Sequence, residues 1–216
     1  MSRIETTLHH IVQMPGAPAG EKHPTLIMLH GRGADEQDLF GLADYLDDRF
    51  LVISARAPFP FSYGGGFTWY DILEVGKPEP AMFQESYTRL CQFFDDVKKN
   101  YPVDATKIFL LGFSMGTMMS YALSLTRPKE IAGVIANSGY IPEGTDLQFR
   151  WNELGTTSFF VAHGIHDPVI PVAMGRRARM LLEQPNAHLV YKEYPMAHQI
   201  SEQSLSDMAH WLTERL

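Results

Sequence analysis

The chain has 216 residues, enough for one domain with a full hydrophobic core over residues 1–216. Its formal net charge of −7 offers no basic surface to phosphates, so nucleic acid is excluded as a partner. Although 45% of the residues are hydrophobic, no apolar run is long enough to span a membrane, and we expect no stable membrane insertion. Residues 1–8 lack a signal-peptide pattern and the single cysteine cannot form an internal disulfide, so we expect a cytoplasmic protein.

Patterns typical of strands and helices alternate along the chain without internal repeats. Apolar runs predict strands at residues 25–29, 51–55, 107–111 and 158–163, and a further strand is predicted at 188–194. Apolar periodicity predicts helices around Leu39–Leu46 and Met82–Val97, and over residues 117–125, 173–182 and 201–216. This alternation predicts an α/β fold with a mostly parallel central sheet and helices on both faces. The longest candidate insertion, residues 140–157, is loop-sized, so we expect no large lid domain.

Residues 112–116 read Gly-Phe-Ser-Met-Gly and lie between the strand predicted at 107–111 and the helix predicted at 117–125. Strand, G-x-S-x-G and helix together are typical of a nucleophile elbow, a strained turn that raises a serine hydroxyl above a sheet. The glycines are expected because the turn leaves no room for a Cβ beside the serine. Ser114 is therefore the predicted nucleophile.

A serine hydroxyl needs a neighbouring base, and the base needs an acid that holds it in one tautomer. In this architecture the acid and then the base follow the serine in the chain. Asp167 lies just beyond the strand predicted at 158–163, where α/β sheets place their functional groups, and His198 lies in the loop before the last predicted helix. These two residues are the predicted acid and base. A turn-forming role for Asp167 ahead of Pro168 remains the alternative.

The oxyanion of an acyl-transfer intermediate is normally bound by two backbone N–H groups. One belongs to the residue after the nucleophile, which is Met115. The second is predicted to be that of Arg32, because Gly31 and Gly33 let the loop after the first strand curl inward. Two interpretations stay open for the Arg32 side chain: a salt bridge to an acidic residue of its own loop (Asp35, Glu36 or Asp38), or a contact with substrate.

These motifs resemble, in order and over nearly the whole chain, those of the phospholipase/carboxylesterase family of α/β-hydrolases. The resemblance rests on residues 30–33, 69–71, 112–116, 163–171 and 196–198. That family holds small bacterial carboxylesterases and the acyl-protein thioesterases. Thioesterase members usually have Gln at the position of Met115 and Leu at that of Arg32, so the resemblance implies the bacterial carboxylesterase branch.

Two segments rich in aromatic residues, 59–70 and 149–151, are candidates for binding the acyl group. We expect substrate contacts from Phe61, Phe67, Trp69, Tyr70 and Trp151. For Trp69 and Tyr70 the alternative is that they anchor their loop in the core. No spacing typical of metal ligands occurs, and triad chemistry needs no ion, so we expect neither metal nor cofactor.

The sequence thus predicts a serine hydrolase that cleaves small-molecule carboxylic esters of short to medium acyl chain through an acyl-enzyme. A lysophospholipase or acyl-thioesterase acting on long chains is the alternative with the same mechanism. A catalytically silent binding protein on a hydrolase scaffold is the alternative of another class, and the complete set of triad and oxyanion residues argues against it. A homodimer is compatible with the sequence.

Overall fold

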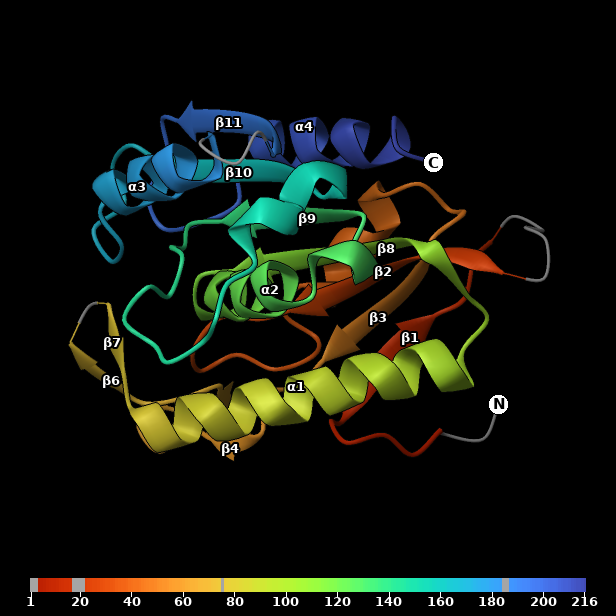
Figure 1. The fold of residues 1–216 in the computed structure, drawn as a ribbon, viewed down its shortest axis with the longest axis horizontal. Coiled ribbons are helices and arrows are strands. Elements are labelled where there is room, and N and C mark those ends of the chain that lie inside the picture. Colours follow the sequence, from red (N-terminus) through yellow and green to blue (C-terminus); the bar gives the residue numbers. More distant parts are fainter. Residues whose placement is uncertain (1–3, 17–21, 75, 184–186) are drawn as a thin grey trace.

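A seven-stranded, mostly parallel sheet forms the centre of the molecule (Figure 1). The computed structural model describes residues 4–16, 22–74, 76–183 and 187–216. In chain order the strands are β1 (His10–Gln13), β2 (His23–Leu29), β3 (Leu51–Ala55), β8 (Val103–Phe113), β9 (Gly133–Asn137), β10 (Ser158–Gly164) and β11 (His188–Tyr194). Their spatial order is β1-β3-β2-β8-β9-β10-β11, and only β1, at one edge, is antiparallel to its neighbour. The prediction of a mostly parallel sheet is confirmed.

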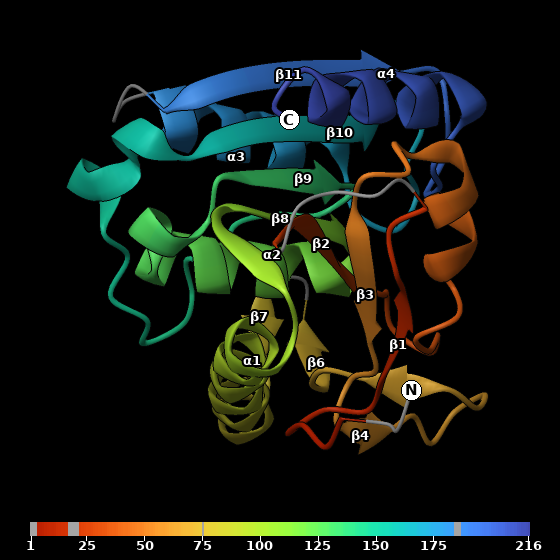
Figure 2. The same ribbon diagram turned by 90° about the vertical axis from the view of Figure 1, so that its right-hand side faces the viewer.

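Helices cover both faces of this sheet (Figure 2). The α-helices are α1 (Pro80–Asn100), α2 (Met115–Thr126), α3 (Val172–Glu183) and α4 (Glu202–Thr213), joined by the 3-10 helices η1 (Phe40–Tyr45), η2 (Pro128–Glu130) and η3 (Trp151–Thr156). Side chains of α1, α2 and α3 share one hydrophobic cluster, and those of η1 and α4 share the cluster on the opposite face. None of the helices in the described part of the chain has the length and apolar character that crossing a membrane requires.

The alternating direction of side chains along each strand explains how one sheet contributes to a hydrophobic cluster on each of its faces. In β8, Ile108 and Leu110 pack in the cluster beneath α1 and α2, whereas Phe109 and Leu111 pack in the cluster beneath α4. Because successive side chains of a strand point to opposite faces, a continuous apolar run is what a strand buried on both faces requires. That is why these strands could be predicted as short apolar runs.

Several elements differ from the prediction. The short strands β1 and β9 were not predicted, nor were two small hairpins, β4 (Phe59–Pro60) with β5 (Phe67–Thr68) and β6 (Ile72–Glu74) with β7 (Lys77–Pro78). The helix expected around residues 39–46 is a 3-10 helix. Residues 140–157, all of which the structure describes, contain η3 as their one helix, so this segment is a loop rather than a lid domain.

The parallel strands bring their carboxyl ends to one edge of the sheet, which lies at the left of Figure 1 near the β6–β7 hairpin. The loops that leave β2, β8, β10 and β11 at this edge carry the oxyanion, nucleophile, acid and base residues that the sequence predicts. The sheet topology thus brings together four segments that are far apart in the chain.

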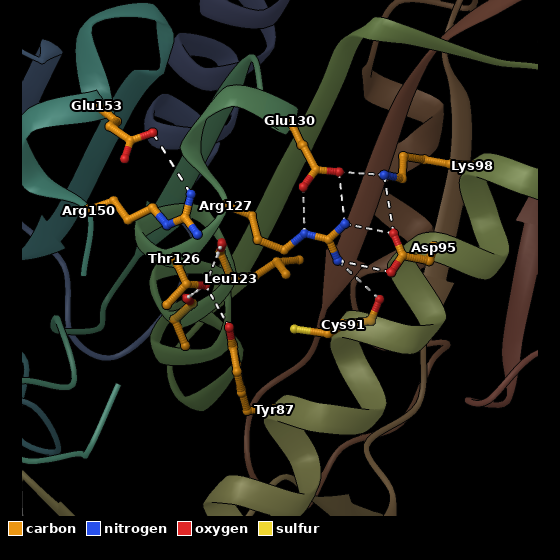
Figure 3. Close-up of polar contacts among 11 residues, drawn as sticks. Tyr87, Cys91, Asp95, Lys98, Leu123, Thr126, Arg127, Glu130, Arg150 and Glu153 are labelled. Carbon is orange, nitrogen blue, oxygen red and sulfur yellow. Dashed lines mark hydrogen bonds and ion pairs between the residues drawn. The ribbon is translucent and has the colours of Figure 1, made fainter. Parts of the chain in front are cut away.

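At the other end of α2, an ion-pair network ties this helix to α1 (Figure 3). The Arg127 guanidinium donates to both carboxylate oxygens of Asp95 on α1 and to both of Glu130 on η2, at 2.7–3.2 Å. Lys98 joins the same two carboxylates, with its Nζ 3.2 Å from Asp95 and 2.5 Å from Glu130. The hydrogen bonds from Arg127 are the main cause that lowers the pKa of both carboxyls below their ordinary values.

We expect Arg127→Met to lower the free energy of unfolding by about 1–2 kcal/mol at pH 7, a modest figure because the carboxylates are partly exposed. Since the folded-state pKa values of Asp95 and Glu130 are depressed, their contribution is present above the ordinary carboxyl pKa and is lost as the pH falls through the folded values. The difference in the free energy of unfolding between wild type and Arg127→Met, measured by urea titration, should therefore shrink as the pH is lowered from 5 to 3. Arg89→Met, which breaks an exposed pair with Glu85 on α1, is the matched control and should change stability by less than about 0.5 kcal/mol.

Candidate active site

Ser114 occupies a sharp turn between β8 and α2. Its backbone has a φ of +51° and a ψ of −119°, a region that residues other than glycine rarely adopt. The Ser114 N–H donates to the carbonyl of Asn137 at the end of β9 (3.0 Å), and the Thr117 N–H donates back to the carbonyl of Ser114 (2.9 Å). The turn is thus held from the neighbouring strand and from the first turn of α2.

The two flanking glycines are required by contacts with other backbone segments. A Cβ at Gly116 would lie 1.9 Å from the carbonyl oxygen of Leu29 at the end of β2, and one at Gly112 would lie 2.5 Å from the Cα of Thr117. Neither neighbour is a flexible side chain that could move aside. The predicted steric role of the glycines in the G-x-S-x-G sequence therefore agrees with the packing.

Asp167 and His198 form a direct hydrogen bond above the same sheet edge, with 2.7 Å between the Nδ1 of His198 and the Oδ2 of Asp167. An ionised carboxylate can only accept, so Nδ1 donates and the Nε2 of the neutral imidazole is left free to accept a proton. The Asp167 side chain is fully buried, whereas 16% of the His198 side chain is exposed. The pair therefore has the arrangement that a general base and its orienting acid need.

Backbone amides hold the other oxygen of the same carboxylate. The Oδ1 of Asp167 accepts the N–H groups of Val169 and Ile170, both at 2.8 Å. Burial alone would raise the pKa of Asp167, but the hydrogen bonds from His198 and from these two amides outweigh it, and the pKa lies below its ordinary value. Asp167 thus stays ionised at neutral pH and can orient His198.

Ring packing places His198 next to the elbow. The Phe113 ring, one residue before Ser114, lies 4.9 Å from the His198 ring between centroids. The loop that carries Asp167 meets the loop that carries His198 just as closely, since a Cβ at Gly164 would lie 2.3 Å from the carbonyl oxygen of Ala197. The structure therefore brings the three predicted triad residues to one side of the sheet edge.

The loop after β2 lies against the elbow as the oxyanion prediction requires. A Cβ built at Gly31 would be 3.5 Å from the Cβ of Ser114, and Gly33 has a φ of +78°. The Gly33 N–H donates to the carbonyl of Phe67 and the Phe67 N–H donates to the carbonyl of Ala34, at 2.8 and 2.7 Å. These hydrogen bonds join the loop to the aromatic segment and fix its course beside Ser114.

Buried His30 supports this loop from inside. Its Nε2 accepts the N–H of Ala57 (3.0 Å), so its Nδ1 carries the proton and donates to the carbonyl of Gly31 (2.6 Å). Burial lowers the pKa of His30, which keeps the imidazole neutral. The indole N–H of Trp69 donates to the carbonyl of His30 at 2.9 Å. His30 and Trp69 together hold the loop that carries Arg32.

Comparison with known proteins agrees with this geometry. The sequence model of the family described as Phospholipase/Carboxylesterase matches residues 11–216. The chain belongs to the phospholipase/carboxylesterase family.

Among curated relatives of this family member, the acyl-protein thioesterase 1 of Saccharomyces cerevisiae is 28% identical, over 89% of this chain and 92% of its own. The acyl-protein thioesterase 1 of Debaryomyces hansenii is also 28% identical, over 78% of each chain. Among solved structures, the carboxylesterase of Bacillus cereus superposes with a TM-score of 0.84 at 24% identity and covers 97% of this chain and 95% of its own. The predicted α/β-hydrolase fold is thereby confirmed, and the protein is a hydrolase of the esterase and thioesterase kind.

The aromatic residues predicted to contact substrate occupy three different environments. Phe61 and Phe67 are half-buried in the segment that borders the oxyanion loop. Trp69 and Tyr70 are 0% and 1% exposed in the core cluster beneath α1. Side chains buried this completely do not line a pocket, so their burial fits the alternative interpretation that Trp69 and Tyr70 anchor their loop in the core.

Trp151 is the one aromatic residue that the fold carries away from the site. It begins η3, which leads into the amino-terminal end of β10, and the neighbouring Arg150 N–H donates to the carbonyl of Leu125 at the far end of α2. Ser114 lies at the opposite end of α2 and at the opposite edge of the sheet. We therefore drop Trp151 as a substrate contact: aromatic composition alone could not distinguish the two edges.

His163 is a supporting residue, for which the sequence favours packing at the end of the strand predicted at 158–163 over lining the site. Its side chain is fully buried behind Asp167, and its Nε2 donates to the carbonyl of Ile170 (2.8 Å), whose own N–H donates to Asp167. Burial lowers the pKa of His163, so the imidazole is neutral at pH 7. His163 thus holds the turn that holds the predicted catalytic acid, and its place at the end of a predicted strand was the signal available in the sequence.

We expect Trp69→Phe to lower kcat/KM by roughly tenfold, because it removes the indole N–H and leaves the His30 carbonyl of the oxyanion loop without that donor. The loss should be the same factor for acetyl through octanoyl esters, since the indole acts on the loop and not on the acyl chain. The matched control is Trp211→Phe, because Trp211 is a buried residue of α4 with no hydrogen-bond partner for its N–H in the described structure. A loss confined to particular chain lengths would instead return Trp69 to the pocket wall.

Proposed function

We propose that this protein is a serine hydrolase that cleaves carboxylic esters of short to medium acyl chain through an acyl-enzyme intermediate. The observation that carries the proposal is the juxtaposition of a serine at positive φ with an Asp167–His198 pair that is joined at 2.7 Å and has its carboxylate buried. Backbone strain at a partly exposed serine, together with an oriented imidazole, is the arrangement that nucleophilic catalysis needs.

In the proposed mechanism the Ser114 Oγ attacks the ester carbonyl while its proton moves to the Nε2 of His198. Asp167 stabilises the imidazolium through the hydrogen bond to Nδ1. The oxyanion accepts the N–H groups of Arg32 and Met115, an interaction worth about 3–4 kcal/mol of barrier for each donor. Collapse of the intermediate breaks the ester C–O bond, and the leaving alkoxide takes the proton from His198. Water then attacks the acyl-enzyme by the same steps and releases the acid and Ser114.

A small apolar cluster supports the preference for shorter acyl chains. Met118 in the first turns of α2, Tyr140 after β9 and Ile170 beside Asp167 are each at most 5% exposed and pack on one another at the carboxyl edge of the sheet. A wall that is already close-packed leaves little depth beyond the elbow for a long chain. The loop-sized 140–157 segment adds no domain that could extend a tunnel.

A long-chain thioesterase is the second candidate, and the sequence relatives favour it. The fungal proteins that match over most of the chain are acyl-protein thioesterases at 26–29% identity. Both candidates use the same catalytic residues, so acyl length and the leaving group distinguish them.

Ser114→Ala should leave the fold intact and reduce ester turnover by about 10⁶, the scale found when a triad nucleophile is removed. A fluorophosphonate probe should label Ser114 in the wild type, as located by peptide mass spectrometry. Ser138 provides the matched control because it is the other serine with positive φ, at +48°, among the described residues. Ser138→Ala should still be labelled, and labelling that survives Ser114→Ala would refute the nucleophile assignment.

A series of p-nitrophenyl esters from acetate to palmitate tests the acyl length. Each buried CH₂ can contribute about 0.8 kcal/mol, so kcat/KM should rise with chain length until the pocket is full and then fall. We expect the maximum at a short to medium chain. A rise that continues through palmitate, matched by efficient cleavage of palmitoyl thioesters, would favour the thioesterase or lysophospholipase function instead.

A further inference from the structure

Arg32 differs from the other arginines that the structure describes in having no acidic partner. It is exposed, and no carboxylate oxygen of the described residues lies within 4.0 Å of its guanidinium. Each of the other described arginines forms at least one ion pair with Asp or Glu; they are Arg49, Arg56, Arg89, Arg127, Arg150, Arg176, Arg177, Arg179 and Arg215. Among the arginines of residues 4–216 that the structure describes, the one guanidinium without a carboxylate partner therefore lies in the loop that borders Ser114.

The acidic residues of this loop do not neutralise it. Glu36 is taken by Arg56, whose Nε lies 2.5 Å from the carboxylate, and by His9 at 3.2 Å. Asp35 accepts the N–H of Gln37 at 2.9 Å. The salt bridge to Asp35, Glu36 or Asp38, which was one of the two interpretations of the sequence, is absent from the described structure.

Stacking holds the guanidinium at the rim of the site. Its Cζ lies 4.7 Å from the centre of the Phe61 ring, and the Phe61 N–H donates to the carbonyl of Gly66 at 2.9 Å. A guanidinium that lies over an aromatic face keeps the N–H groups of its edge available for a planar anion. Gly31, the preceding residue, lies against Ser114, so Arg32 belongs to the loop that borders the proposed nucleophile.

We propose that Arg32 forms an anion subsite and that the preferred substrates are esters that carry a second, free carboxylate. A carboxylate matches the guanidinium fork in a bidentate pair, which gives both affinity and orientation. The net charge of −7 repels anions at long range, so a local cation is needed to bind one beside Ser114. This inference rests on the proposed esterase function and adds the class of substrate.

Two matched pairs of substrates test it on the two sides of the ester bond. In the first pair, monoethyl adipate carries a carboxylate at the end of the acyl chain and ethyl hexanoate carries a methyl group there. In the second pair the difference lies on the leaving group, which carries a carboxylate in 3-acetoxybenzoate and a neutral amide in 3-acetoxybenzamide. The readout is the ratio of kcat/KM for the anionic substrate to that for its neutral partner. Arg32→Met keeps the stacked stem but removes the charge, and should lower this ratio about ten- to a hundredfold in at least one pair.

Three controls make the result specific. Arg32→Lys keeps the charge but not the planar fork and should restore only part of the ratio. Arg89→Met removes the same charge on α1, away from the sheet edge, and should leave the ratio unchanged. Raising the salt concentration should lower the wild-type ratio more than that of Arg32→Met. Equal ratios in wild type and Arg32→Met for both pairs would overturn the anion subsite, whereas failure to cleave any of the four esters would overturn the proposed function itself.

Discussion

The arrangement of the site depends on one contact between backbones, where the start of α2 meets the end of β2. At Gly116 the two chains approach so closely that a Cβ would lie 1.9 Å from the carbonyl oxygen of Leu29. Because β2 and β8 are neighbours in the sheet, this contact sets the first turn of α2 directly over the loop that follows β2. Ser114 must then take a positive φ, at a cost of about 1–3 kcal/mol that the surrounding packing offsets. The same approach brings the first turn of α2 and the loop of Arg32 together beside Ser114.

Behind each of the two loops that border the serine lies a buried histidine that stays neutral. His30 joins the Ala57 amide to the Gly31 carbonyl, and His163 donates to the carbonyl of Ile170. Burial lowers the pKa of both, so each imidazole serves as a fixed donor, and His30 also as an acceptor, without introducing a charge into the core. Only His198, which is partly exposed and bonded to a carboxylate, is placed to take up a proton. The environments of the three histidines thus separate support from catalysis.

The positively charged side chains also fall into two groups, those with a carboxylate partner and those without one. Most Lys and Arg side chains of the described structure form ion pairs with Asp or Glu, such as those of the Arg127 network that fastens α1 to the far end of α2. These pairs hold helices whose apolar faces already pack on the sheet. At the functional edge, by contrast, the guanidinium of Arg32 is left to face the solvent. A common family fold therefore leaves room for specificity at a few positions of the edge loops, where side chains change without disturbing the sheet.

Local pattern was sufficient wherever a residue's role follows from its immediate neighbours. The apolar run of β3, the strand at β11 and the glycines around Ser114 could all be predicted from the sequence, because steric and pairing rules act over a few residues. Short β9, which begins with a glycine, and β1 at the sheet edge gave too weak a pattern to be predicted. Composition likewise grouped Trp69 and Trp151 as equivalent aromatic residues. Tertiary structure alone decided that one lies buried under the oxyanion loop and the other at the opposite edge of the sheet, because such distances depend on how α2 crosses the sheet and not on any local preference.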